Sequence, residues 1–170
     1  RQGDRALINY ARRFDGLTEP VEVSAREIQR GAAKTPSVVR AALRKSAIHI
    51  RKIARLQVPK KWRSQLVPGV VVEQRVTPLA RVGCYVPGGR YPLPSSLLMT
   101  AIPARVAGVR DVIAVCPRLE PAVCSAALEA GISRLFRIGG AHAIAALAYG
   151  TKSVPRVNKI VGPGSTFVAS

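Results

Sequence analysis

The stretch that decides the fold covers residues 111–140 and reads DVIAVCPRLEPAVCSAALEAGISRLFRIGG. It begins with a continuous apolar run over 111–116, followed by a helical pattern of about 120–130 that ends at Gly131. A second apolar run covers 134–138. Continuous apolar runs are typical of strands that are buried on both faces, and a helix between two strands connects them in parallel. The stretch therefore predicts strand, helix and strand in a parallel sheet.

The same alternation continues on both sides of this stretch. Towards the C-terminus, we expect an alanine-rich helix over 141–149 and a short strand over 158–161. Towards the N-terminus, we expect a strand over 81–86 and a helix of about 95–108. Strands and helices that alternate at these lengths predict an α/β fold with a parallel sheet of the doubly wound type.

The first third of the chain is expected to be helical. Leu7, Tyr10 and Phe14 recur at helical spacing, which predicts one apolar face. The composition then changes towards the alternating pattern. We therefore expect two parts: a helical, basic N-terminal segment over 1–64 and an α/β part over 65–170.

A long helix is expected over 36–57, because Thr35-Pro36 is a helix start signal. One side of this helix is mainly basic, with Ile48 as the exception, and two lysines follow the helix. These basic residues are Arg40, Arg44, Arg51, Arg55, Lys60 and Lys61. No acid interrupts the region 40–63, whereas an ordinary solvated face mixes both signs. The stripe is a candidate surface for RNA or another polyanion, and a solvated face without a partner is the alternative.

The charge balance is unusual for a packed protein. The 170 residues include 27 Lys and Arg but 9 Asp and Glu, which gives a formal net charge of +18. Such a balance favours anionic ligands or polyanionic partners. Hydrophobic residues make up 48% of the chain, which indicates a packed fold and excludes disorder throughout. No apolar run approaches the roughly 20 residues of a membrane span, so no membrane segment is expected.

Cysteine and histidine provide little catalytic chemistry. Cys84, Cys116 and Cys124 lack the spacing of zinc ligands, and we expect them to be reduced and buried in a cytoplasmic protein. The two histidines, His49 and His142, are far apart and have no acid beside them in the sequence. We therefore expect no metal site and no catalytic residues within these 170 residues. The absence of an initiator Met and of an apolar leader suggests a partial, unsecreted chain.

Glycine-rich turns follow three of the expected strands. They are Pro87-Gly88-Gly89, Gly139-Gly140 and Gly162-Pro163-Gly164. In an open parallel sheet, such turns share the carboxyl edge, where ligands bind. Glycine allows backbone amides to approach a phosphate or a flat ring closely. For each turn taken singly, a tight turn without a ligand is the preferred explanation. For three turns on one edge of the sheet, a ligand-binding edge is supported as well as tight turns alone.

Two side chains border these turns. Tyr85 ends a strand just before Pro87 and can stack on a base or bond to a ligand, although a structural tyrosine is the alternative. His142 begins the helix after Gly139-Gly140, where the helix dipole disfavours a charged imidazole. A neutral ring there can donate to or accept from a ligand.

The glycine turns lie in longer strings that resemble the histidinol dehydrogenase family. The strings are VGCYVPGG (82–89), GGAHAIAALAYGT (139–151) and VPRVNKIVGPG (154–164), and the similarity extends in order over essentially the whole chain. The resemblance implies an incomplete Rossmann-like fold. It also implies an oxidoreductase of histidine biosynthesis that oxidises L-histidinol to L-histidine with NAD. The family is zinc-dependent, dimeric and cytoplasmic.

The resemblance also implies cofactor-binding residues. The family typically binds NAD through a Tyr, a Gln and an Asn; Tyr85 keeps the first, while His142 and Ser165 stand at the other two positions. An imidazole lacks the paired donor and acceptor of an amide, and serine is shorter than asparagine, so the resemblance implies weaker NAD binding. The expected cofactor site consists of Tyr85, Gly88, Gly89, Gly139, Gly140, His142, Gly162, Gly164 and Ser165.

Three functional interpretations follow. In the first, the chain is the N-terminal portion of a histidinol dehydrogenase, inactive alone because the zinc ligands and the Glu-His acid/base pair come later in the full-length enzyme. In the second, it is a pseudoenzyme or relic that binds RNA or another polyanion through the basic stripe. In the third, it is an incomplete gene product without a function.

Overall fold

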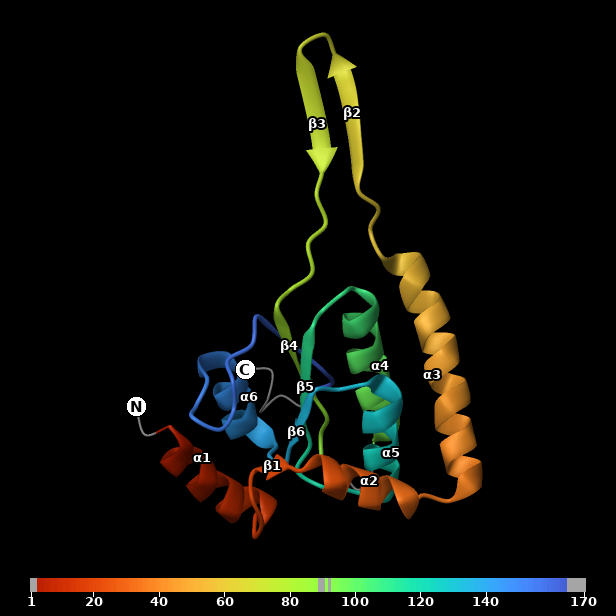
Figure 1. The fold of residues 1–170 in the computed structure, drawn as a ribbon. Coiled ribbons are helices and arrows are strands. Elements are labelled where there is room, and N and C mark those ends of the chain that lie inside the picture. The colour runs from red at the N-terminus through yellow and green to blue at the C-terminus, as the bar shows by residue number, and fades with distance from the viewer. Residues whose placement is uncertain (1–2, 89–90, 92, 165–170) are drawn as a thin grey trace.

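The computed structural model describes residues 3–88, 91 and 93–164. Its centre is a five-stranded sheet in the order β1-β6-β5-β4-β7 (Figure 1). The strands are β1 (Glu22–Val23), β4 (Arg81–Tyr85), β5 (Asp111–Val115), β6 (Arg134–Phe136) and β7 (Lys159–Val161). β4 to β7 pair in parallel, and only the short β1 pairs antiparallel, with β6. The expected parallel α/β sheet is confirmed.

Helices cover both faces of this sheet. One face carries α2 (Ala25–Ala33), α3 (Ser37–Gln57), α4 (Pro94–Val106) and α5 (Pro121–Ala130). The other carries α1 (Asp4–Tyr10) and α6 (Gly140–Tyr149). The strand order advances from β4 through β5 to β6 and then returns to β7 on the other side of β4. The fold is therefore doubly wound, and its order reverses between β4 and β7.

The apolar core lies in two layers because successive side chains of a strand point to opposite faces. In β5, Val112 and Ala114 pack with the α4 and α5 layer, while Ile113 and Val115 pack with α6. All four are fully buried, as a continuous apolar run predicts. Tyr85 of β4 points to the α6 layer, which places its side chain on the same side of the sheet as α1 and α6.

The N-terminal segment differs in part from expectation. Leu7 is buried, but Tyr10 and Phe14 are 49% and 63% exposed, so the expected apolar face was wrong. The buried side consists of Leu7 and Ala11, which are four residues apart as on an ordinary helix, and the π-helix Ala11–Asp15 that continues α1 changes the direction of Phe14. A π-helix has more residues per turn than an α-helix, so the spacing of an ordinary helix no longer predicts which side chains face inward. The division at residue 64 stays a prediction, although the segment before it adds β1 to the sheet.

A hairpin projects from the body of the molecule (Figure 1). It consists of β2 (Trp62–Val67) and β3 (Val70–Gln74), which pair antiparallel, and every residue of both strands is exposed. Pro59 precedes β2 and Pro68 follows it, and proline is unfavourable within a strand. Pro68 instead lies in the turn of the hairpin with Gly69, whose φ of +83° is one that glycine adopts readily.

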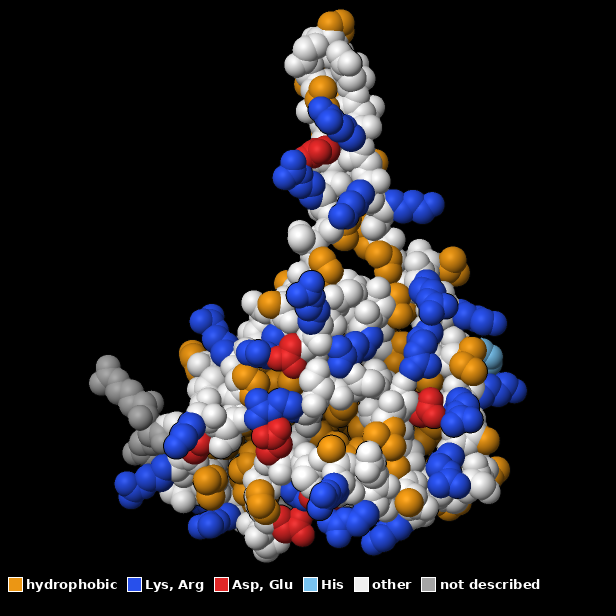
Figure 2. All heavy atoms as spheres, viewed as in Figure 1, with side chains coloured by type: hydrophobic (Ala, Val, Ile, Leu, Met, Phe, Trp, Pro, Cys, Tyr) orange, Lys and Arg blue, Asp and Glu red, His pale blue; other side chains and the backbone are white. Residues whose placement is uncertain are grey.

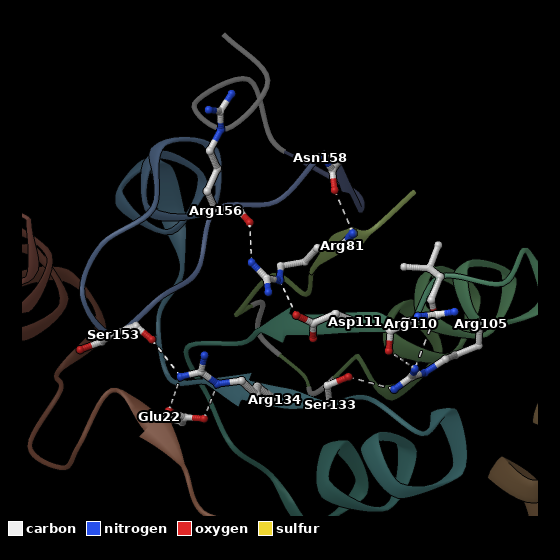
Figure 3. A network of polar contacts seen from close by, with 11 residues as sticks. Glu22, Arg81, Arg105, Arg110, Asp111, Ser133, Arg134, Ser153, Arg156 and Asn158 are labelled. Atoms are coloured by element: carbon white, nitrogen blue, oxygen red, sulfur yellow. Dashed lines mark hydrogen bonds and ion pairs between the residues drawn. The ribbon is translucent and has the colours of Figure 1, made fainter. Parts of the chain in front are cut away.

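Charged side chains form ion pairs at the amino ends of the parallel strands β4, β5 and β6 (Figure 3). Arg81 at the start of β4 pairs with Asp111 at the start of β5. Arg134 at the start of β6 donates two hydrogen bonds to Glu22 of β1, at 2.6 and 2.5 Å. This edge of the sheet is therefore closed by ion pairs between neighbouring strands.

Basic side chains are spread over the visible surface, both on the body and at the base of the hairpin (Figure 2). Acidic side chains are few on this face and lie mostly beside basic ones. In the part of the chain that the structure describes, no helix combines the length and the apolar character needed to cross a membrane.

Candidate functional site

The ends of β4 and β7 approach each other closely at the reversal of strand order. Tyr85 ends β4 and Gly162 directly follows β7. A Cβ atom on Gly162 would lie 2.2 Å from the carbonyl oxygen of Tyr85, and the φ of Gly162 is +153°. Only glycine fits this approach. In open α/β sheets, ligands bind outside the carboxyl ends of the strands at such a reversal, so the candidate site is centred here.

Tyr85 connects this point to the next glycine turn. Its ring is buried, and its hydroxyl oxygen accepts a hydrogen bond of 3.2 Å from the backbone N–H of Gly140. Burial raises the pKa of Tyr85; the Gly140 amide lowers it, and the negative charge of Asp15 raises it further. The net shift is upward, so the hydroxyl keeps its proton at neutral pH and can donate it to a ligand.

His142 and the Gly139-Gly140 turn are held by a residue of the N-terminal segment. The Oδ2 atom of Asp15 lies 2.7 Å from Nε2 of His142 and accepts a 2.9 Å hydrogen bond from the N–H of Gly139. The side chains of His142 and Asp15 are 10% and 9% exposed. In the sequence, Asp15-Gly16 has only the pattern of a helix end, which indicates no binding site. Its partners are more than 100 positions away, and no local signal points to them.

Two aromatic rings lie beside the imidazole of His142. The ring centroids of Tyr10 and Phe14 lie 6.2 and 6.3 Å from it, and the two rings also stack on each other. A groove of about 260 Å³ runs beside His142 between α1 and α6, with small side chains along much of its floor. The exposed rings that the helical spacing misplaced therefore lie beside the candidate site.

The glycines of the site are required for different physical reasons, either close packing or backbone conformation. A Cβ atom on Gly88 or Gly139 would lie 2.5 or 2.7 Å from Cγ of Pro117, so close packing explains both. Gly140 has a φ of +57°, and a Cβ atom there would lie 3.5 Å from Cε1 and Nδ1 of His142. Gly140 thus borders polar atoms of two side chains, Tyr85 and His142.

The structure brings together most of the expected cofactor residues that it describes. Tyr85, Gly139, Gly140 and His142 are connected by hydrogen bonds and contacts, and Gly162 touches Tyr85. Gly164 is exposed in the turn after β7. Gly89 and Ser165 lie outside the described residues.

The basic stripe of α3 is partly engaged. Nε of Arg44 lies 3.3 Å from Oε1 of Glu129, and Arg51 donates to the backbone oxygen of Glu129. Glu129 lies in the last turn of α5, where a cation is favoured by the helix dipole. The region 40–63 contains no acidic residue, so the acidic partner of the stripe comes from α5. The other four basic residues are exposed: Arg40, Arg55, Lys60 and Lys61.

Nothing within residues 3–88, 91 and 93–164 is arranged as a metal site. No three His, Cys, Asp or Glu side chains of this part could hold an ion together. The cysteines are free and buried as expected, and burial raises the pKa of Cys84 and Cys116 to about 11, so both are thiols at neutral pH. The resemblance places the zinc ligands in a later part of the full-length enzyme, and the described residues offer no other group of side chains for the ion.

Comparison with known proteins gives one consistent answer. A sequence model described as histidinol dehydrogenase matches residues 1–170. Histidinol dehydrogenase from Syntrophotalea carbinolica is 49% identical over 99% of this chain and 41% of its own length, and that from Methanothermobacter thermautotrophicus is 45% identical at the same coverage. The crystal structure of histidinol dehydrogenase from Elizabethkingia anophelis superposes with a TM-score of 0.90 at 34% identity, covering 97% of this chain and 40% of that one. The chain thus spans about two fifths of the length of these relatives.

Proposed function

Because the chain belongs to the histidinol dehydrogenase family, we propose that it provides the NAD-binding edge for the oxidation of L-histidinol to L-histidine in histidine biosynthesis. One observation carries the proposal: Tyr85, Gly140 and His142 meet at the carboxyl edge, where the strand order reverses. NAD, when bound, supplies the acceptor for the hydride that leaves the alcohol carbon.

The described residues fit a flat and polar ligand. Tyr85 can donate its hydroxyl proton, and the space over Gly140 has no Cβ atom that would keep a ring away from the backbone. Two exposed aromatic rings, Tyr10 and Phe14, offer apolar surface beside this position. In this proposal the chain binds and orients the cofactor.

The acid/base and zinc chemistry of the reaction is assigned to the remaining part of the longer enzyme. The described part of the chain contains no group of side chains that fits a metal. The relatives are more than twice as long as this chain. We therefore propose that the isolated 170 residues do not oxidise histidinol, and that the complete enzyme works as a cytoplasmic homodimer.

Thermal unfolding with and without NAD tests the proposed function. A ligand that binds only the folded state raises the melting temperature as its concentration rises above Kd. We expect millimolar NAD to stabilise the wild-type chain and to stabilise the Tyr85→Phe variant less, by about 0.5–1.5 kcal/mol, the net contribution of one hydrogen bond. Ser64→Ala is the control, because it also removes one hydroxyl group and Ser64 is exposed on β2 of the projecting hairpin. An unchanged wild-type melting temperature would contradict the proposal.

Binding of RNA or another polyanion stays a prediction with less support. Arg44 and Arg51 contact Glu129, so the stripe already stabilises the packing of α3 on α5. Nonspecific binding through the remaining cations would appear as retention on heparin that falls steeply with salt. Retention that is insensitive to salt would remove this alternative.

A further inference from the structure

Asp15 contacts two parts of the candidate site at once. A single carboxylate oxygen, Oδ2, accepts from the backbone of Gly139 and meets the imidazole of His142. Asp15 lies at the end of the π-helix, and Gly16, with a left-handed φ of 67°, ends that helix directly after it. The N-terminal segment therefore reaches the glycine turn through one buried side chain.

This contact decides which nitrogen of His142 carries the proton. An ionised carboxylate is only an acceptor, so the nitrogen that faces Asp15 must be the donor. That nitrogen is Nε2, at 2.7 Å from Oδ2. In the neutral ring the other nitrogen, Nδ1, then has a free lone pair, and the Nδ1–Cε1 edge of the ring faces Gly140.

Tyr85 provides the complementary hydrogen-bonding group, a donor. Its hydroxyl oxygen accepts from the N–H of Gly140, which leaves the hydroxyl proton free to donate. Gly140 therefore has one donor and one acceptor beside it, each from a different element of the fold. An amide side chain would offer both groups by itself, whereas here Tyr85 and His142 share them.

Building on the proposed function, we propose that Asp15 is a positioning residue: it fixes His142 as the Nε2–H tautomer, so that Tyr85 and His142 together recognise a ligand group with an acceptor next to an amino donor. Two chemical groups have this pattern, a primary carboxamide and the edge of an amino-substituted purine. NAD carries one of each.

The tautomer can be measured directly by NMR with ¹⁵N-labelled histidine, because the chain has 2 histidines. His49 is exposed on α3 and serves as the internal reference. Under alkaline conditions that keep both rings neutral, we expect His142 to show a slowly exchanging Nε2–H proton and His49 to show none. A wild-type His142 that carries its proton on Nδ1 would overturn the proposal without any variant.

Variants separate positioning from general stability. Asp15→Ala is expected to remove the slowly exchanging Nε2–H signal, and Asp15→Asn, which keeps an acceptor oxygen, is expected to retain it. The matched control is Asp4→Ala, because Asp4 also lies on the N-terminal helix and accepts from the N–H and hydroxyl of a distant residue, Ser153. An Asp15→Ala protein that retains the His142 signal would show that Asp15 does not set the tautomer.

Titration with half-ligands identifies the recognised group. Nicotinamide mononucleotide supplies the carboxamide, adenosine monophosphate the aminopurine, and purine riboside monophosphate a purine without the amino group or any other N–H donor on the base. We expect one of the first two to shift the Nδ1 resonance of His142 and purine riboside monophosphate to leave it unchanged. We expect Asp15→Ala to weaken binding about two- to tenfold. If NAD raises the melting temperature while neither half-ligand shifts Nδ1, the recognition pattern is wrong and the proposed function stands. If NAD has no effect on melting, the proposed function falls and the tautomer result is unaffected.

Discussion

At the amino ends of its strands the sheet is joined by charged side chains, whereas at the carboxyl ends it has glycines and a few polar groups. Arg81, Asp111, Arg134 and Glu22 bond to one another in pairs along the first edge (Figure 3). Along the second edge, Tyr85 has a proton left to donate after its bond to Gly140.

This difference indicates that one edge of the sheet contributes to folding stability and the other edge to ligand binding. Groups that bond to each other gain little from a ligand, since their hydrogen-bonding capacity is already used. Groups fixed by one bond, with a second bond still to make, are oriented before a ligand arrives. The amino edge therefore maintains the register of the strands, and the carboxyl edge provides the candidate site.

We expect the largest loss of folding stability when one methyl group is added at the carboxyl edge of the sheet. In Gly162→Ala the new Cβ would overlap the carbonyl of Tyr85, and overpacking of this kind costs about 1–3 kcal/mol in addition to the backbone strain. Gly69→Ala is the control, because its φ is also positive but nothing lies within 4 Å of the added Cβ. Chemical denaturation should show a clearly larger loss for Gly162→Ala. Equal losses would mean that β4 and β7 are not in such close contact.

A smaller effect is expected at the amino edge. Arg105 of α4 donates to the carbonyl oxygens of Gly131 and Arg110, at 2.7 and 2.6 Å, and to the hydroxyl of Ser133 at 3.0 Å. Arg105→Met keeps the apolar stem and removes these bonds, which should reduce the free energy of unfolding by about 1–2 kcal/mol. The stabilisation of the folded variant by NAD should equal that of the wild type. A changed response to NAD would show that the two edges are coupled.

The smallest effect concerns acid stability at the same edge. The hydrogen bond from Arg134 lowers the pKa of Glu22 below the ordinary value of 4.5, although burial acts in the opposite direction. A lowered pKa gives stability that is present above the ordinary pKa and is lost as the pH falls through the folded-state value. Glu22→Gln should therefore remove part of the acid-induced loss of stability below about pH 4.5, a few tenths of a kcal/mol for this partly exposed pair. Identical acid denaturation curves for the two proteins would contradict this assignment.

Local signals predicted the regular parts of the fold well. The strands β4 and β5 and the helices α3, α5 and α6 lie close to where apolar runs, caps and glycines predicted them, because these signals act within a few residues. The start of α2 is likewise fixed by a local contact, the capping bond from the N–H of Glu27 to the hydroxyl oxygen of Ser24. Thr35, expected to cap the long helix, instead bonds to the hydroxyl of the buried Ser125, a contact between distant segments.

Features that depend on distant contacts were not predictable from the sequence. The hairpin strand β2 lacks an alternating apolar pattern, and its partner determines its conformation. The role of Asp15 depends on His142, which is 127 positions away. The site was therefore predictable where its residues end a strand or follow a glycine turn, and unpredictable where the N-terminal segment reaches it.

The strand order also has a consequence for the time at which the site forms during synthesis. β4 lies between β5 and β7, and β7 is the last strand of the described sheet to leave the ribosome. Until then, one edge of β4 has unpaired backbone groups, and such an edge readily pairs with other chains. The part of the candidate site where Gly162 contacts Tyr85 is therefore completed only when β7 and Gly162 have been synthesised. We expect a nascent chain that stops before β7 to need chaperones and to bind no nucleotide.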